Sequence, residues 1–152
     1  FYALQNLHYS AIDKWPMISD KKMNLTELKI PDATYDCVIC MDTLEYLSDD
    51  RHAMQELFRI LKKGAWAIIQ SRVDQDADRT LENTSFASFE ERQKYFISSG
   101  HVRLYGRDYG TRLEEAGFLV KQRRFAIELG PVMIQRCSLS QSDIIYICHK
   151  PS

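Results

Sequence analysis

The stretch that decides the fold is YDCVICMDTLEYLSDD, residues 35–50. Its first half is almost continuously apolar, which predicts a strand covered on both faces in a parallel sheet. Its second half is a turn that carries four carboxylates, Asp42, Glu45, Asp49 and Asp50. Because carboxylates this close together repel one another, we look for function first in this turn.

A helix and a second strand follow this turn. The apolar residues of the helix recur at i, i+3, i+4 and i+7, and they are Met54, Leu57, Phe58 and Leu61. Ser48 or Asp49 is the expected N-cap, and Gly64 is the residue expected to end the helix. The run AWAIIQSRV, residues 65–73, is the next expected strand. Such a strand–helix–strand unit is right-handed and parallel in nearly all proteins.

The remaining segments complete an α/β pattern. Residues 9–13 form a short apolar run that ends on an acid, which predicts a strand. Residues 74–105 are polar and too long for an ordinary connection, with a short helix expected in SFEERQKYF, residues 88–96. A further helix is expected between Asp108 and Gly117. Residues 118–129 and 143–150 are expected to be two antiparallel strands with no helix between them.

Composition bounds the class of protein. A chain of 152 residues with 45% hydrophobic content predicts one domain, residues 1–152. The net charge of -1 is spread along the chain, so we expect no nucleic-acid and no membrane partner, and a cytoplasmic location. Cys37 and Cys40 form a CxxC, but residues three apart in a strand point to opposite faces. We therefore expect these two cysteines, and also Cys137 and Cys148, to be core or near-core residues with no metal.

At this point the motifs resemble a known family. Residues 35–70 resemble the segment that follows the cofactor-binding half of class I S-adenosylmethionine-dependent methyltransferases, of the type 11 kind. The later HVRLYGRDYGTRLEEAGF, residues 101–118, resembles a segment of the branch that acts on small molecules. The resemblance implies a Rossmann-like three-layer α/β sandwich with a mostly parallel sheet, a C-terminal antiparallel pair and a missing first strand. It also implies S-adenosylmethionine as cofactor and a small-molecule methyl acceptor.

The resemblance assigns cofactor contacts to seven positions. Asp13 matches the acid that accepts hydrogen bonds from the ribose hydroxyls, with a simple turn acid as the alternative. Trp15 lies where an aromatic ring stacks on adenine, or else belongs to the core. Asn24 and Leu25 match the pair at the adenine edge. The methionine part of the cofactor is implied to lie beside Met41, Asp42 and Thr43, where a negative potential favours the cationic sulfonium.

Three departures from the family pattern affect this interpretation. The family's His after Leu-Glu is Tyr46 here, and its LKPGG is Lys62-Lys63-Gly64-Ala65. The Gly-rich motif that approaches the cofactor does not occur in the chain. We therefore expect these 152 residues to bind cofactor weakly or not at all by themselves. We also expect an unpaired sheet edge, through which a homo-oligomer can form.

No residue receives a catalytic assignment from the sequence. His101 is a candidate base, Tyr46 replaces the family's His, and Arg103 is a candidate anchor for an anionic acceptor or a partner of Glu90 or Glu91. Two other functions stay open: a non-catalytic interaction module of the same fold, and a nicotinamide-dependent oxidoreductase. The antiparallel last pair of strands argues against the oxidoreductase.

Overall fold

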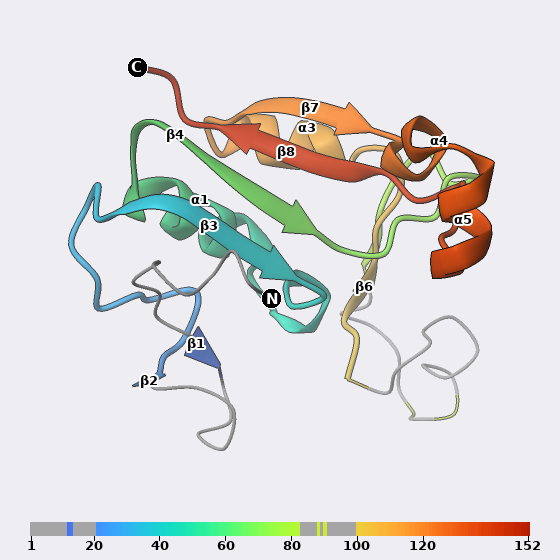
Figure 1. Ribbon diagram of the computed structural model, residues 1–152. Helices are drawn as coiled ribbons and strands as arrows, with labels where there is room; N and C mark the ends of the chain where they lie inside the picture. Colours follow the sequence, from blue (N-terminus) through green and yellow to red (C-terminus); the bar gives the residue numbers. More distant parts are fainter. Residues whose placement is uncertain (1–11, 14–20, 83–87, 89, 91–99) are drawn as a thin grey trace.

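The centre of the protein is a four-stranded sheet with the order β3-β4-β8-β7 (Figure 1). Its strands are β3 (Tyr35–Met41), β4 (Leu61–Gln70), β7 (Leu119–Arg123) and β8 (Ile145–His149). β3 and β4 are parallel, and β8 is antiparallel to both β4 and β7. Three strands thus point the same way around one reversed strand, so the expected mostly parallel sheet with an antiparallel C-terminal pair is confirmed.

The computed structural model describes residues 12–13, 21–82, 88, 90 and 100–152. The short helix expected at residues 88–96 therefore lies almost entirely outside the described residues. The base of this long connection is closed by a two-stranded antiparallel sheet of β5 (Leu81–Glu82) and β6 (Arg103–Leu104).

Helices α1 (Asp50–Ile60) and α3 (Tyr109–Glu115) pack on one face of the sheet (Figure 1). Together with that face they bury a core that includes Met54, Leu57, Ala67, Ile69, Leu113 and Cys148. Residues that pair directly across strands share a face, and on the opposite face large apolar side chains are exposed: Ile39, Met41, Trp66 and Leu119. The expected three-layer sandwich has helices on both faces of the sheet. In the described part of the chain, helices cover only one face.

The predicted N-cap of α1 is confirmed at Asp49, whose Oδ1 accepts a hydrogen bond of 2.9 Å from the backbone N–H of His52. The end of α1 differs from the prediction, because the helix stops at Ile60 and Leu61 already has extended backbone. Leu61 pairs with Tyr35 of β3, so it belongs to the sheet, and the helix ends before the residue at which its end was expected.

Gly64 consequently lies inside β4 rather than after the helix. Its φ of 74° is in the left-handed region, and its N–H donates to the carbonyl of Lys150 over 3.0 Å. The register between β3 and β4 shifts beside it, between Tyr35 and Cys37. Gly64 therefore allows an irregularity in the strand, which is a common use of glycine.

Two helices that the sequence did not predict join β7 to β8. They are α4 (Phe125–Leu129) and α5 (Pro131–Cys137), so the expected long strand over residues 118–129 is wrong beyond Arg123. β8 offers no partner past the Arg123–Ile145 pair, and an unpaired strand would leave backbone groups without hydrogen bonds. Pro131 starts α5 at the position where its missing N–H costs nothing.

Residues Ile12–Asp13 (β1) and Lys21–Lys22 (β2) form a separate two-stranded parallel sheet. No described strand pairs with the outer edge of β3. The last two residues of the expected strand ending at Asp13 are present as β1, and the outer edge of β3 is unpaired among the described strands.

The cysteine prediction holds for three of the four residues. Cys40 and Cys148 are buried and Cys37 is half-buried, but Cys137 is exposed because α5 buries none of its residues. Among the described residues no group of ligands that could hold a metal ion is found, and no helix is long and apolar enough to cross a membrane.

Candidate functional site

The carboxyl end of β3 presents an exposed acid on a fixed backbone. Asp42 has a left-handed φ of 47°, and its N–H donates to the carbonyl of Gln70 at the end of β4 over 2.9 Å. The Oγ1 of Thr43 donates to the carbonyl of Met41 over 2.8 Å. The carboxylate of Asp42 is exposed and forms no ion pair with any described residue, so it faces solvent from a rigid turn.

The next acid, Glu45, is buried rather than exposed. It lies in the short helix η2 (Leu44–Tyr46), is 4% exposed, and accepts a hydrogen bond of 2.9 Å from Ser71 Oγ. Burial raises the pKa of Glu45, and the negative charge of Asp42 acts in the same direction. The hydrogen bond from Ser71 and the nearby charge of His101 oppose this rise in pKa.

Tyr46 and His101, two of the three catalytic candidates, lie in contact beside this turn. Their ring centroids are 4.5 Å apart in an edge-to-face arrangement. A backbone hydrogen bond of 2.8 Å from Val102 N–H to the carbonyl of Glu45 holds the segment of His101 against η2. Tyr46 is 46% exposed and His101 is half-buried, so both rings are accessible from solvent.

The fourth acid of the turn, Asp50, is the centre of a buried ionic cluster. It is 2% exposed, and its Oδ2 accepts hydrogen bonds from Tyr105 Oη at 2.8 Å and from Arg112 Nη1 at 3.2 Å. Arg103 Nη2 lies 3.5 Å from the other oxygen, and Glu82 bonds Arg112 over 2.5 Å. Of the four acids in this turn, Asp50 is thus the one whose charge is compensated by arginines from a distant segment.

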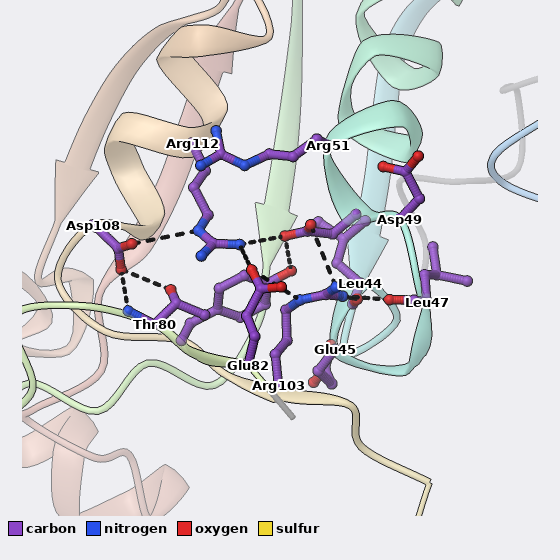
Figure 2. Close-up of polar contacts among 12 residues, drawn as sticks. Leu44, Glu45, Leu47, Asp49, Arg51, Thr80, Glu82, Arg103, Asp108 and Arg112 are labelled. Atoms are coloured by element: carbon purple, nitrogen blue, oxygen red, sulfur yellow. Dashed lines mark hydrogen bonds and ion pairs between the residues drawn. The ribbon is translucent and has the colours of Figure 1, made fainter. Parts of the chain in front are cut away.

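Arg103, the third candidate, is a structural residue of this cluster. It is 2% exposed, and its guanidinium donates to the carbonyls of Leu44 and Leu47 (Figure 2). It also donates to the carbonyl of Ser48. Its acidic partners are Asp50 and Glu82, not Glu90 or Glu91. A guanidinium so engaged is not free to anchor an acceptor, because binding would leave the buried carbonyls unpaired.

The positions implied for the adenosine end of the cofactor are only partly described. Asp13 is the last residue of β1, and Trp15 and the side chain of Asp13 lie outside the described part of the chain. Asn24 follows β2, and its Oδ1 accepts hydrogen bonds from the N–H and Oγ1 of Thr26 at 3.1 and 2.9 Å. Leu25 packs against the core. Asp13, Asn24 and Asp42 thus each stand at or just after the carboxyl end of a strand.

The described part of the site fits a cationic ligand with an apolar portion. Asp42 supplies an unpaired negative charge, and the neighbouring side chain of Met41 is 56% exposed. A sulfonium carries both features, a positive charge and attached alkyl groups. Asp42, Met41 and Thr43 are the described residues that would hold this part of S-adenosylmethionine.

Comparison with known proteins identifies the protein family to which the chain belongs. A family model described as a methyltransferase domain matches residues 3–122. A curated relative from Mycolicibacterium smegmatis, named "Probable S-adenosylmethionine-dependent methyltransferase", is 31% identical over 58 residues, which are 38% of this chain and 23% of the relative. The chain therefore belongs to the methyltransferase domain family, of which S-adenosylmethionine is the cofactor.

Solved structures show the same fold at low identity. The [4+2]-cyclase SpnF is 20% identical with a TM-score of 0.57, over 86% of this chain and 56% of that chain. A candidate methyltransferase of Bacillus halodurans is 16% identical with a TM-score of 0.58, over 93% and 81%. The Haemonchus contortus phosphoethanolamine N-methyltransferase 2, solved with phosphomonomethylethanolamine and S-adenosylhomocysteine, is 14% identical with a TM-score of 0.52, over 85% and 36%. The chain thus spans less than two thirds of the curated relative and of the cyclase.

Sequence reasoning missed two parts of this region. The first is the Glu45–Ser71 hydrogen bond, and the second is the pairing of Asp50 with arginines. The only sequence signal for the pairing of Asp50 was the presence of arginines in residues 101–118. Spacing within that segment does not indicate which acid they reach.

Proposed function

We propose that the protein takes part in S-adenosylmethionine-dependent methyl transfer to a small-molecule acceptor, at the carboxyl ends of β3 and β4. The observation that carries the proposal is the contact of Tyr46 with His101, 4.5 Å between ring centroids, beside the unpaired acid Asp42. The Haemonchus contortus neighbour, whose structure holds a small phosphorylated amine, supports a small acceptor. A cytoplasmic location is part of the proposal.

The proposed cofactor contacts follow the strand ends. Asp13 would accept hydrogen bonds from the ribose, Trp15 would stack on adenine, and Asn24 with Leu25 would border the adenine edge. Asn24 Oδ1 already accepts two hydrogen bonds within its turn, so its amide NH₂ is the group left for adenine. Met41, Asp42 and Thr43 would border the methionine part.

Methyl transfer requires few catalytic groups from the protein. When bound, S-adenosylmethionine supplies an activated methyl group for an in-line displacement, so the protein contributes proximity and orientation. Asp42 stabilises positive charge at the carboxyl end of β3. His101 accepts the proton that an acceptor hydroxyl or amine loses, and the edge of Tyr46 holds the imidazole in place. Glu45 keeps η2 fixed through Ser71.

A second function is favoured by a specific observation, the absence of the Gly-rich motif from the chain. In this alternative the chain is a non-catalytic interaction module, and the free edge of β3 is the surface through which it assembles, also with a second copy. One structural neighbour is a [4+2]-cyclase, which shows that proteins of this fold also catalyse other reactions.

Calorimetric titration with S-adenosylmethionine and a tritium-transfer assay against a panel of small amines, phenols and carboxylates test the proposal. In a chain that includes a Gly-rich loop, Asp13→Ala should weaken cofactor binding by about 1.5 to 3 kcal/mol. His101→Gln should lower the transfer rate by about 10²-fold or more with the cofactor Kd unchanged.

The 152 residues alone should bind cofactor weakly or not at all. Micromolar binding by these residues would overturn that expectation, and an unchanged Kd for Asp13→Ala would remove this residue from the site. Tight cofactor binding with no transfer to any acceptor, and no effect of His101→Gln, would favour the interaction module.

A further inference from the structure

The segment between β7 and β8 exposes apolar side chains that no part of the described core covers. We call α4 and α5 together, residues 125–137, the α4–α5 hairpin. Phe125, Ile127, Leu129 and Val132 are 46%, 50%, 39% and 76% exposed. In the whole hairpin only Ala126 is buried. Helices this short are not stable by themselves, and a contiguous exposed apolar surface usually marks a place of interaction.

The α4–α5 hairpin itself carries one acid and one base, Glu128 and Arg136, and the residues that lead into it add three bases, while the whole chain is slightly acidic. Residues 119–137 contain four basic residues and one acid, a local net charge of +3, against -1 for the chain. Arg123 and Glu128 pair with each other. The side chains of Lys121, Arg124 and Arg136 are exposed and make no hydrogen bond or ion pair within the described part of the chain. Lys121 lies in β7, Arg124 directly precedes α4 and Arg136 lies in α5, so three free cations lie within the hairpin or in the residues that lead into it.

This combination selects one kind of partner. A second copy of the chain would bring the same +3 surface against itself in a twofold contact, which is repulsive. A nucleic acid would match the charge but not the exposed Phe125, Ile127 and Val132, because backbone phosphates offer these side chains no apolar contact. An anionic lipid surface offers negative head groups for the arginines and an acyl boundary for the apolar side chains.

The hairpin lies at the functional edge of the sheet. β7 points in the same direction as β3 and β4, because β8 is antiparallel to both of its neighbours. Figure 1 shows α4 and α5 at the end of the sheet toward which the arrowheads of β3, β4 and β7 point. A membrane that contacts the hairpin is therefore on the side of the molecule that carries Asp42 and Tyr46.

We propose that the α4–α5 hairpin docks the protein peripherally on an anionic lipid surface. Phe125 and Val132 enter the boundary between head groups and acyl chains, while Arg124 and Arg136 contact lipid phosphates. No membrane partner was expected from the low net charge of the whole chain, which does not report this surface because every acid except Glu128 lies outside residues 119–137. The proposal goes beyond methyl transfer and does not depend on it.

Vesicle flotation tests the proposal with the chain of 152 residues. The protein should float with vesicles of phosphatidylcholine and phosphatidylglycerol, and much less with pure phosphatidylcholine. Arg124→Gln combined with Arg136→Gln should lower the partition coefficient about thirtyfold, since each basic residue near the surface contributes about fivefold. Phe125→Ser combined with Val132→Ser should lower it at least tenfold.

Matched controls are available on other surfaces. Arg72→Gln changes another exposed arginine, and Ile39→Ser removes an exposed apolar side chain, 64% accessible, from the open sheet face. Neither should alter flotation. Circular dichroism melting curves should stay unchanged for all variants, because every altered side chain is exposed.

Three outcomes would overturn the proposal. Equal binding to neutral and anionic vesicles would remove the role of the arginines. Equal loss of binding with Ile39→Ser would assign the membrane contact to the open sheet face. Absence of flotation, with light scattering showing a dimer that Phe125→Ser and Val132→Ser dissociate, would make a second copy the occupant of the hairpin.

Discussion

Asp50 shows how one acid of a crowded turn is neutralised by residues that lie far away in the sequence. Its carboxylate is 2% exposed and lies within 3.5 Å of two guanidinium groups, from Arg103 and Arg112. A buried ion pair adds little net stability when compared with apolar residues of the same shape. Removal of one member is costly, because the remaining charges stay buried without compensation.

Asp50→Ala should therefore lower the free energy of unfolding by about 3 to 5 kcal/mol, measured by urea denaturation. Asp36→Ala is the matched control, since Asp36 pairs with Lys62 on the exposed surface, where the change should stay below about 1 kcal/mol. Equal effects of the two substitutions would show that the cluster does not hold Asp50 as described.

Glu45 should make stability depend on pH. Burial raises the pKa of Glu45, so the folded protein binds more protons than the unfolded chain at pH values between the ordinary and the raised pKa. The contribution of Glu45 to stability therefore falls as pH rises from its ordinary value of 4.5 through this window. Glu45→Gln keeps an acceptor for Ser71 and removes the charge.

The variant Glu45→Gln should gain stability relative to the unmodified protein as pH rises from acidic to neutral. Unfolding curves in urea at a series of pH values measure this difference. A difference in unfolding free energy that does not change with pH would mean that Glu45 keeps its ordinary pKa.

At the scale of elements, residues 77–80 are held against the start of α3. Asp108 Oδ1 accepts hydrogen bonds from the N–H and Oγ1 of Thr80 at 2.8 and 2.7 Å, and the Asp108 side chain makes no cap hydrogen bond to α3. Burial of the Asp108 carboxyl group raises its pKa, but the hydrogen bonds from Thr80 lower it, and the net effect is a lowered pKa of Asp108. The base of the long connection is thus fixed to the fold.

Gly106 is the point of closest approach between these elements. A Cβ at Gly106 would lie 2.5 Å from the backbone carbonyl carbon of Arg79, so Gly106→Ala should destabilise the protein by about 1 to 3 kcal/mol in thermal or urea unfolding. Gly110→Ala is the control, because the short contact of its Cβ is with the flexible end of Gln122, while the Tyr146 ring lies at an ordinary 3.6 Å. Alanine in α3 should be neutral or stabilising by up to about 1 kcal/mol. A tolerated Gly106→Ala would mean that residues 77–80 are not packed here.

At the scale of the whole molecule, Lys150 connects the last strand to the first helix. It follows β8, and its Nζ donates to the carbonyls of Phe58 and Leu61 at 2.8 Å each. These carbonyls lie at the C-terminal end of α1, where helix carbonyls lack partners within the helix. The ammonium also lies 4.6 Å from the centroid of the Phe58 ring.

Lys150→Met should lower the unfolding free energy by about 1 to 3 kcal/mol, since it keeps the apolar stem and leaves helix carbonyls unpaired. Lys63→Met, on an exposed lysine nearby, should change it by less than about 0.5 kcal/mol. If both variants unfold at the same urea concentration, Lys150 does not cap α1 in solution.

Local sequence predicted elements well where local chemistry decides them. The cap at Asp49 and the parallel β3–β4 pair follow from spacing. The reversed β8 was expected from a connection without a helix, and β8 is antiparallel although α4 and α5 lie in that connection. The end of α1 could not be read from Gly64, because the pairing of Leu61 with Tyr35 determines it. The two short helices after Arg123 were not predicted, because β7 ends where its partner β8 ends, and the sequence around Arg123 does not show where β8 ends.

The sequence by itself determined the α/β class, the family and the turn at which acids gather. Only the tertiary structure decided what each acid does: Asp42 stays exposed and unpaired, Glu45 is buried against Ser71, and Asp50 is paired with Arg103 and Arg112. The physical reason is that burial and ion pairing depend on residues far away in the chain. Periodicity and spacing describe only neighbours along the backbone.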